Sequence, residues 1–355
     1  MSGLSTPLLL AVLFVSGLVV VAGGNSLATT GDRISEHTGF GRVFVGALFI
    51  AVATSLPELG TAGTAALRNA PDLAIGDLYG SSMANMAILA VVDLLYRQRV
   101  MPTVELGHTR VAAVAIGLTA LSLMAINTPG SASVGGVGVT SIGIGAIYLA
   151  ALVWFRKVPA LGTAVADPEA FRTSPRPRRA LAGRLRGAAR SHDERGPDTT
   201  SGLAWRFGAA TLALLAATPV LTIATEATGE RFGISEGALG ITVLAIATSM
   251  PELSTSLAAV RIGAADLAVG NLMGSNAANV ALILFVDVLY RPGPVLDAVD
   301  ESLAVAGTGA ILLMALAVAS IASGRVNRAH RFEPDSAVLL VAYVAAMVGV
   351  AVATS

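Results

Sequence analysis

The chain has 355 residues, of which 54% are hydrophobic and only 13% are charged, and its mean hydropathy is +0.73. One soluble core cannot bury that much apolar surface, so the composition is typical of a helical protein that crosses a membrane several times. The 23 basic residues balance the 23 acidic ones, which excludes the basic footprint of a nucleic-acid-binding protein, and the lack of cysteine excludes disulfides and thiolate chemistry.

In chain order, apolar runs long enough to cross the hydrocarbon core, roughly 20 residues each, predict about ten transmembrane helices. The predicted spans are 7–27, 41–67, 72–95, 110–127, 132–155, 204–226, 236–260, 266–290, 301–323 and 335–353. We therefore expect an all-α membrane protein with a first five-helix half over 1–155, a basic loop over 156–203 and a second five-helix half over 204–355. The only lysine, Lys157, follows Arg156 instead of glycine, which excludes a Walker A loop.

Arginine placement predicts the orientation in the membrane. The basic segments surround Arg33, Arg97 to Arg110, Arg156 to Arg195, and Arg325 to Arg331. They alternate with connections such as Asn127 to Ser133 and Gly293 to Glu301, which carry no basic residue or are acidic, so the central loop is expected in the cytoplasm and both termini outside. Because each half has an odd number of spans, the second half enters from the opposite side, and the halves are related by inversion. A cleavable signal is the alternative for the first span, but no basic residue precedes it.

Residues 46–97 and 240–291 are the same segment written twice, aligned without a gap at a constant offset of 194. Each copy places a glutamate, Glu58 or Glu252, directly after a proline in the middle of an apolar span. Proline removes a backbone donor and clashes with the preceding turn, so both helices are predicted to break there. An ionisable group at this depth normally marks a substrate or ion path.

Helical spacing surrounds each glutamate with oxygen ligands. The candidate residues are Ala51, Thr54, Ser55 and Glu58 in the first copy, and Ala245, Thr248, Ser249 and Glu252 in the second. The following span adds a stripe at i, i+4 and i+8, which is Asp77, Ser81 and Asn85 in the first copy and Asn271, Ser275 and Asn279 in the second. The glycine pairs beside these stripes, Gly76 with Gly80 and Gly270 with Gly274, predict close helix approach.

This set contains carboxylate, hydroxyl, amide and carbonyl oxygens only, which suits Ca²⁺ and Na⁺ better than soft transition metals. Two facing carboxylates repel each other, and a bound divalent cation cancels that repulsion. Na⁺ ions or protons can occupy the same oxygens, so competition alone produces exchange. We expect no resident cofactor, and Ca²⁺ and Na⁺ enter as transported substrates.

Four further acids are interpreted as structural. Asp93 and Asp287 end their spans near Tyr96 and Tyr290, which predicts solvation at the membrane interface. Asp72 and Asp266 begin their spans, which predicts a helix N-cap.

At ATSLPEL with GDLYGSSMAN, and at ATSMPEL with GNLMGSNAAN, the chain resembles the sodium/calcium exchanger branch of the calcium/cation antiporter superfamily. The resemblance implies inverted five-helix halves that work by alternating access around a mid-membrane cation site. It implies shared carboxylate ligands from Glu58 and Glu252, further oxygens from Thr54 and Thr248, and a middle position completed by Asn85 and Asn279. Flanking Na⁺ positions are implied at the carbonyls near Ala51 and Ala245 with Ser81 and Ser275.

Two departures from the family pattern concern ion coupling. The family usually has Gly-Asn where Gly76 is followed by Asp77, and Ser82 stands where the second copy has Asn276. An added carboxylate at Asp77 is suited to K⁺ or H⁺ coupling, or to lining an entrance.

The sequence therefore predicts a multi-pass antiporter of the cell membrane that exchanges Ca²⁺ for Na⁺ and is not an enzyme. A proton- or potassium-coupled Ca²⁺ antiporter is the alternative. An intramembrane hydrolase would need an asymmetric site with a nucleophile or a histidine, whereas the copies are symmetric and no histidine lies in a predicted span. A gated channel would differ in carrying uncoupled, downhill flux.

Overall fold

The computed structural model describes residues 5–38, 45–95, 100–101, 104, 106–128, 130, 132–157, 199–231, 248–323 and 334–353. The first half contains α1 (Thr6–Thr38), the π-helix η1 (Val45–Ile50), α3 (Ala51–Thr54), α4 (Leu56–Leu67), α5 (Pro71–Leu95), α6 (Gly107–Ile126), a hairpin of β1 (Ser133–Val134) and β2 (Val137–Gly138), and α7 (Val139–Lys157). The second half contains α10 (Thr200–Arg231), α13 (Met250–Arg261), α14 (Ala265–Leu289), the 3₁₀ turns η4 (Val295–Asp297) and η5 (Glu301–Leu303), α15 (Ala304–Ser323) and α16 (Pro334–Ala353).

The predicted all-α membrane fold is confirmed. Seven described helices are long and apolar enough to cross a membrane, and an eighth span is counted if the bent pair Val45–Thr54 and Leu56–Leu67 is one broken span. The shorter apolar helix Val139–Phe155 corresponds to the predicted fifth span. Only the end of the predicted span 236–260 lies among the described residues, as α13, and most of the predicted loop 156–203 lies outside them.

Two span boundaries differ most from the prediction. The predicted span 132–155 starts late, at Val139, because Gly135 and Gly136 adopt positive φ angles of 62° and 87° and turn the preceding residues into a hairpin. The first span is longer than the predicted 7–27, since α1 continues as a helix to Thr38. The apolar run marks only the part that faces hydrocarbon, whereas the helix continues wherever its backbone bonds can form.

The predicted helix break is present in the first repeat, and the described part of the second repeat has the same backbone conformation at the equivalent residue. In the first repeat the helix axis bends by 47° between Thr54 and Leu56. Ser55 at the bend has φ −88° and ψ 6°, and Ser249 in the second repeat has almost the same values, −84° and 5°. Pro57 and Pro251 follow two residues later, in the first turn of α4 and α13, where a missing N–H costs least.

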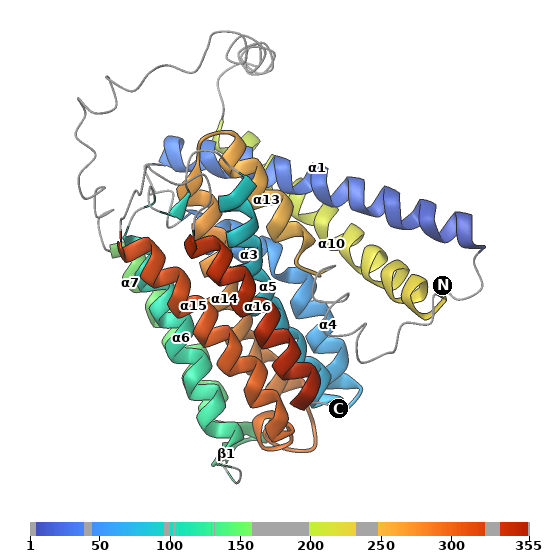
Figure 1. Cartoon of the computed structure of the whole chain (residues 1–355), viewed down its shortest axis with the longest axis vertical. Helices are drawn as coiled ribbons and strands as arrows, with labels where there is room; N and C mark the ends of the chain where they lie inside the picture. The colour runs from blue at the N-terminus through green and yellow to red at the C-terminus, as the bar shows by residue number, and fades with distance from the viewer. Residues whose placement is uncertain are drawn as a thin grey trace.

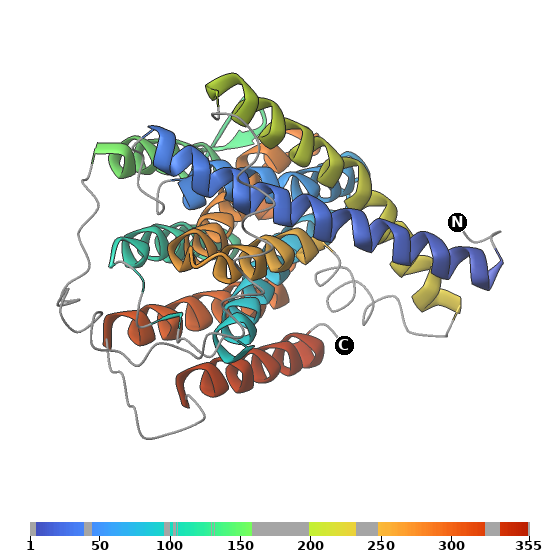
Figure 2. The same cartoon turned by 90° about the horizontal axis from the view of Figure 1, so that it is seen from above.

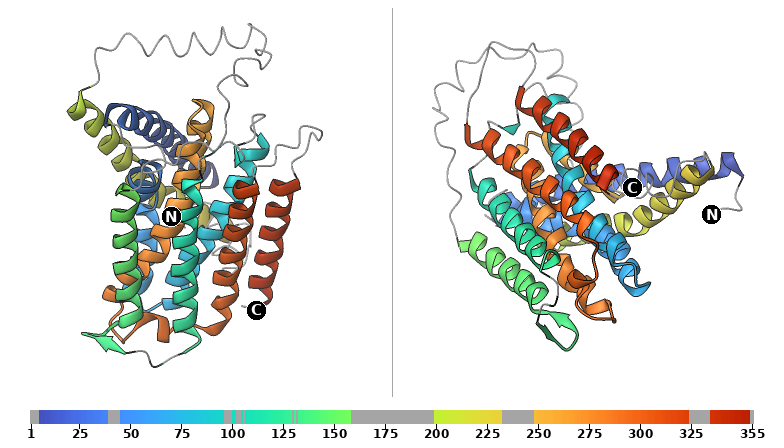
Figure 3. Two further views of the ribbon diagram at one scale, coloured as in Figure 1. Left: turned by 90° about the vertical axis from the view of Figure 1, so that its left-hand side faces the viewer. Right: turned by 60° about the horizontal axis from the view of Figure 1, so that its bottom comes forward.

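The helices form an upright bundle and an inclined pair. Figures 1 and 3 show α5, α6, α14, α15 and α16 running side by side, with α7 at one edge. Helices α1 and α10 lie together and extend obliquely from the bundle, which Figure 2 shows from above. Most of α16 is uncovered, since only Ser336, Leu339 and Val350 are buried on it. Such an apolar outer face is expected to contact lipid.

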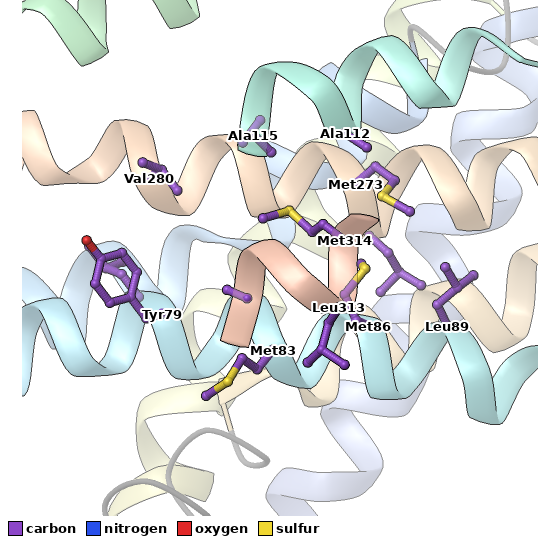
Figure 4. Close-up of a cluster of buried hydrophobic side chains, with 14 of the residues drawn as sticks. Tyr79, Met83, Met86, Leu89, Ala112, Ala115, Met273, Val280, Leu313 and Met314 are labelled. Atoms are coloured by element: carbon purple, nitrogen blue, oxygen red, sulfur yellow. The ribbon is translucent and has the colours of Figure 1, made fainter. Parts of the chain in front are cut away.

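Side chains of α5, α6, α14 and α15 interlock in the middle of the bundle (Figure 4). Met83 and Met86 of α5 lie next to Leu313 and Met314 of α15, and all four are fully buried. Tyr79 is also fully buried, and its hydroxyl hydrogen-bonds Ser122 Oγ at 2.7 Å. This rigid packing holds α5 and α14, the helices that carry the second polar stripe of each repeat, in place.

Hydrogen bonds between the halves join helix ends that the arginine pattern places on the same side. The bonded pairs are His37 with Thr200 and His108 with Asp266 at one end, and Arg231 with Thr6 and Asp300 with Asp72 at the other. The first and third pairs make α1 and α10 antiparallel. This is the relation that the odd span count predicts for inverted halves.

The interpretation of Asp93 and Asp287 as solvated interfacial residues is wrong. They are only 4% and 1% exposed. Asp93 Oδ1 accepts the amides of Val100 and Met101, and Asp287 accepts the amides of Val295 and Gly138. The chain after each span folds back over its end, so backbone amides replace water around the carboxylate.

The N-cap interpretation is also wrong for Asp266, because Ala264 occupies the N-cap of α14. Asp266 lies two residues further on, in the first turn of α14, and its Oδ1 is 3.0 Å from His108 Nε2. Asp72 lies in the first turn of α5, and its Oδ1 accepts the Asp300 amide at 2.8 Å. Both acids therefore connect the two halves.

The predicted close approach at the glycine stripe of the second repeat is confirmed. A Cβ on Gly274 would lie 2.5 Å from Ala47 Cα and 2.7 Å from Ala47 O. A Cβ on Gly46 would lie 2.9 Å from Leu267 O and 3.1 Å from Gly270 Cα. Helix α14 thus packs backbone to backbone against η1 and α3, and this contact positions the break beside the polar stripe.

Gly274→Ala is expected to force these backbones apart and to destabilise the protein by about 1–3 kcal/mol, as overpacking of a close contact does. The measurement is the melting temperature of the purified protein in detergent. Gly117→Ala is the matched control, because nothing lies within 4 Å of a Cβ at this helical glycine. Equal melting temperatures for the two variants would contradict the close-packing account.

Candidate cation site

Each glutamate of the repeat lies in the first turn of a helix that starts inside the bundle. Glu58 begins α4 and Glu252 begins α13, directly after the break. Both side chains are 0% exposed. The free amides and the positive end of the helix dipole favour a negative charge at this position. Apolar surroundings oppose it, because burying a charge without a partner is costly.

Most of the oxygens of these two carboxylates lack a hydrogen-bond donor in the described part of the chain. Among the described residues, neither Oε1 nor Oε2 of Glu58 has a partner, and Oε2 of Glu252 has none. Glu252 Oε1 accepts from Ser275 Oγ at 3.4 Å, a long bond. Ser275 Oγ also lies 3.4 Å from Thr54 Oγ1, one helical turn before Glu58, so the surroundings of the two glutamates meet at this hydroxyl. Two buried acids with unused lone pairs are the arrangement that a cation completes.

Hydroxyl and amide groups join the break of the first repeat to the polar stripe of the second. Thr54 Oγ1 lies 3.0 Å from Asn271 Oδ1 and 3.4 Å from Ser275 Oγ. Ser275 Oγ in turn lies 3.5 Å from the carbonyl oxygen of Ala51. These residues are fully buried. The inverted repeats therefore bring Thr54 and Ala51 of one copy next to Ser275 of the other, close to Glu252.

The reciprocal contacts are also present. Ser81 Oγ of the first repeat lies 3.4 Å from Thr248 Oγ1 of the second. Asn85 donates through Nδ2 to Asn276 Oδ1 at 2.9 Å, and Asn276 Nδ2 donates to the carbonyl of Ser82 at 3.2 Å. The polar stripes of the two repeats thus meet, as the inversion predicts.

Several predicted site residues retain unused polar atoms in this interior. The buried atoms without a partner in the described part of the chain include Ser55 Oγ, Ser249 Oγ, Asn85 Oδ1, and both Oδ1 and Nδ2 of Asn279. Natural proteins seldom leave so many buried polar atoms unpaired unless a ligand or water completes them. Ala245 lies outside the described residues.

Asp77 occupies a different place from its counterpart Asn271. Asn271 bridges Thr54 and Ser256 inside the polar network. Asp77 Oδ2 instead accepts from Thr61 Oγ1 at 2.7 Å, and Asp77 borders a cavity. The two copies therefore differ in structure where they differ in sequence.

Two residues of this network were not among the predicted ligands. Asn276 joins the repeats through both ends of its amide, and Thr61 binds Asp77. Asn276 is one residue away from the stripe at i, i+4 and i+8, so helical spacing did not select it. The difference between Ser82 and Asn276 in the two copies was the available signal.

The donor set suits a hard cation. Within the described ranges, no three or more His, Cys, Asp or Glu side chains are grouped so that they could hold a metal ion by themselves. The interior around Glu58 and Glu252 offers carboxylate, hydroxyl, amide and carbonyl oxygens from four segments of the chain. Such mixed oxygen sites are typical of Ca²⁺ and Na⁺ ligation.

Known proteins match this chain over most of its length, and a solved structure among them has the same fold. CaxA of Alkalimonas amylolytica is 26% identical over 344 residues, which is 94% of this chain and 97% of that protein. The inner membrane protein YrbG of Escherichia coli strain K12 is 27% identical over 288 residues, 80% of this chain and 81% of that one. A structure of the sodium-calcium exchanger NCX_Mj, at 18% identity, aligns with a TM-score of 0.71 over 97% of this chain and 99% of its own.

A family model described as sodium/calcium exchanger protein matches residues 8–155 and 202–352. The match covers both signature repeats and most of the chain. The protein therefore belongs to the sodium/calcium exchanger family.

Proposed function

We propose that the protein is a secondary active antiporter that exchanges Ca²⁺ for Na⁺ across the membrane by alternating access. The observation that carries this proposal is the pair of fully buried glutamates, Glu58 and Glu252, on two inverted repeats, with three of their four oxygens lacking a donor among the described residues. Membership in the sodium/calcium exchanger family supports the same ions and the same class of transport.

Charge balance explains how the two ions compete. Two ionised glutamates carry two negative charges, which one Ca²⁺ neutralises. Na⁺ ions neutralise the same charges when at least two of them bind together. Because both ions need the same oxygens, binding of one displaces the other. An empty site would leave two buried carboxylates in repulsion, which disfavours the return of an unloaded carrier.

The proposed ligands come from both repeats. They are the carboxylates of Glu58 and Glu252, the hydroxyls of Thr54, Thr248, Ser55, Ser249, Ser81 and Ser275, the amides of Asn85 and Asn279, and the carbonyls of Ala51 and Ala245. The hydrogen bonds of Thr54 with Ser275 and of Ser81 with Thr248 support this grouping. We further propose that the protein lies in the cell membrane with both termini outside and the 156–203 loop in the cytoplasm.

Purified protein in proteoliposomes is expected to accumulate ⁴⁵Ca²⁺ when an outward Na⁺ gradient is imposed, because Na⁺ leaving through the shared site drives Ca²⁺ inward. Parallel vesicles receive a K⁺ or a proton gradient in place of the Na⁺ gradient. Uptake driven by K⁺ or protons but not by Na⁺ would replace the Na⁺-coupled proposal with the alternative coupling. Uptake that never exceeds the equilibrium distribution would identify a channel.

Glu58→Gln and Glu252→Gln are each expected to reduce Na⁺-driven ⁴⁵Ca²⁺ uptake to the level of protein-free vesicles. Each removes one of the two charges that balance Ca²⁺ while keeping the side-chain volume. Glu301→Gln is the matched control, because Glu301 is exposed in η5, away from the site. Wild-type uptake by either site variant would refute the shared two-glutamate site.

A further inference from the structure

A cavity of about 720 Å³ lies between α4, α5 and α10. It reaches Pro57, the residue before Glu58, and it is bordered by Thr61 and Asp77 from the first repeat and by Leu215 and Thr218 from α10. Its walls are therefore built by both halves of the protein. The central site does not use these four residues.

Asp77 has an unused carboxylate oxygen at this cavity. The side chain is only 9% exposed, and Oδ1 has no hydrogen-bond partner among the described residues. Oδ2 accepts from Thr61, whose Oγ1 also lies 3.2 Å from the carbonyl oxygens of Pro57 and Glu58. A hydroxyl has only one proton, and the shortest contact, 2.7 Å to Asp77, takes it. The hydroxyl lone pairs of Thr61 remain available.

Helix α10 supplies two further oxygens. Thr218 is 0% exposed, and its Oγ1 has no partner within the described chain. Pro219 lies inside the same helix and has no N–H to donate to the carbonyl of Leu215, four residues earlier. Both Thr218 and Leu215 border the cavity. The proline thus leaves a backbone acceptor without its helical donor at the same place where a hydroxyl has no partner among the described residues.

The corresponding place in the inverted half is closed. The offset of 194 relates Gly24 to Thr218 and Ser254 to Gly60. A Cβ on Gly24 would lie only 2.0 Å from Ser254 Oγ, so α1 and α13 are in direct contact. Gly60, in contrast, borders the cavity and has nothing within 4 Å of a Cβ. If α10 and α4 came into the direct contact that α1 and α13 make, Thr218 would pack against Gly60. The closed cavity would then enclose whatever is bound at Asp77.

We propose that this cavity holds a separate binding site for one monovalent alkali cation, which we call the station. This proposal rests on the proposed antiport function. Its ligands are the Asp77 carboxylate, the hydroxyls of Thr61 and Thr218, and the carbonyl of Leu215. One carboxylate balances one positive charge, whereas a divalent cation would leave an uncompensated charge among apolar walls. Arg68 also borders the cavity but is exposed, so water screens its charge.

Occupancy of the station influences the central site. Thr61 Oγ1 binds Asp77 Oδ2 and also lies 3.2 Å from the carbonyl oxygen of Glu58, one helical turn earlier on α4, so a charge at Asp77 is near Glu58. A cation at Asp77 therefore lowers the negative potential at the glutamates and favours the release of Ca²⁺. The second repeat has no such station at the related place, because Asn271 is neutral and bonded to Thr54 and Ser256.

The test compares Na⁺ activation of ⁴⁵Ca²⁺ transport with exchange of Ca²⁺ for Ca²⁺ in the absence of Na⁺. Asp77→Asn introduces the residue that the second repeat has at this place and keeps the shape. It is expected to raise the half-activating Na⁺ concentration roughly ten-fold, the loss expected for one charged ligand. Ca²⁺-for-Ca²⁺ exchange is expected to persist, with a weaker apparent affinity for Ca²⁺ because the charge of Asp77 no longer acts on Glu58. Unchanged Na⁺ activation would overturn the station. Loss of Ca²⁺-for-Ca²⁺ exchange would also overturn it, because Asp77 would then belong to the central site.

Thr218→Val is a second variant that leaves every acid in place, and it is expected to shift Na⁺ activation in the same direction. Thr211→Val is its control on α10, since the Thr211 hydroxyl is already bonded to the Phe207 carbonyl. Equal Na⁺ curves for the two threonine variants would overturn the station. A K⁺ titration at constant Na⁺ identifies the occupant: a K⁺ effect that Asp77→Asn removes assigns the station to K⁺, and its absence together with a shifted Na⁺ curve assigns it to Na⁺.

The results of the Asp77 and Thr218 tests can be distinguished from a failure of the antiport proposal itself. If wild-type protein shows no cation-driven Ca²⁺ uptake, the proposed function is wrong. The purified protein then still reports on the station through the rise in melting temperature that Na⁺ or K⁺ causes. The wild-type rise is expected to be lost in Asp77→Asn, and an equal rise in both proteins would overturn the station.

Discussion

The structure depends on one electrostatic constraint, which is that Glu58 and Glu252 are both fully buried in the middle of an apolar bundle. Two ionised carboxylates in that position are unstable without positive charge. The chain reduces the cost by breaking each helix so that the glutamate lies in a first turn, where the helix dipole is favourable. We propose that a bound cation supplies the remaining compensation. Selectivity for Ca²⁺ or Na⁺ is then expected from the surrounding hydroxyl, amide and carbonyl oxygens, because they resemble the oxygens of these ions' hydration shells.

The inverted repeat turns this site into a carrier. The same helix-break sequence enters from opposite sides, so its two copies face each other and share hydroxyl contacts such as Thr54 with Ser275. The structure is nevertheless asymmetric outside the centre. Ser254 packs directly against Gly24, while the related Gly60 borders an open cavity. An exchange of these two arrangements between the halves is the simplest motion that would open the other side.

Much of this organisation could be predicted from the sequence, because its strongest signals are local. The gap-free repeat, the proline before each glutamate and the apolar runs predicted the inversion, the breaks and most helix ends.

The errors arose where distant segments meet. Asp287 looked interfacial because its span ends there, yet the amides of Gly138 and Val295 cover it. Asn276 was missed because its partner, Asn85, lies on another helix, and no spacing rule within one helix reports that contact. The difference between Asp77 and Asn271 was visible in the sequence, but the cavity beside Asp77 was not, since α10 forms one of its walls.

The central claim is that Ca²⁺ and Na⁺ compete for one set of oxygens around the two glutamates. Calorimetric titration of Ca²⁺ into the purified protein at a series of Na⁺ concentrations tests it most directly, because it requires no transport and no membrane. The account predicts that the apparent Kd for Ca²⁺ rises more steeply than in proportion to Na⁺, since more than one Na⁺ is needed to balance the charge that one Ca²⁺ balances. A Kd for Ca²⁺ that does not change with Na⁺ would contradict the shared site.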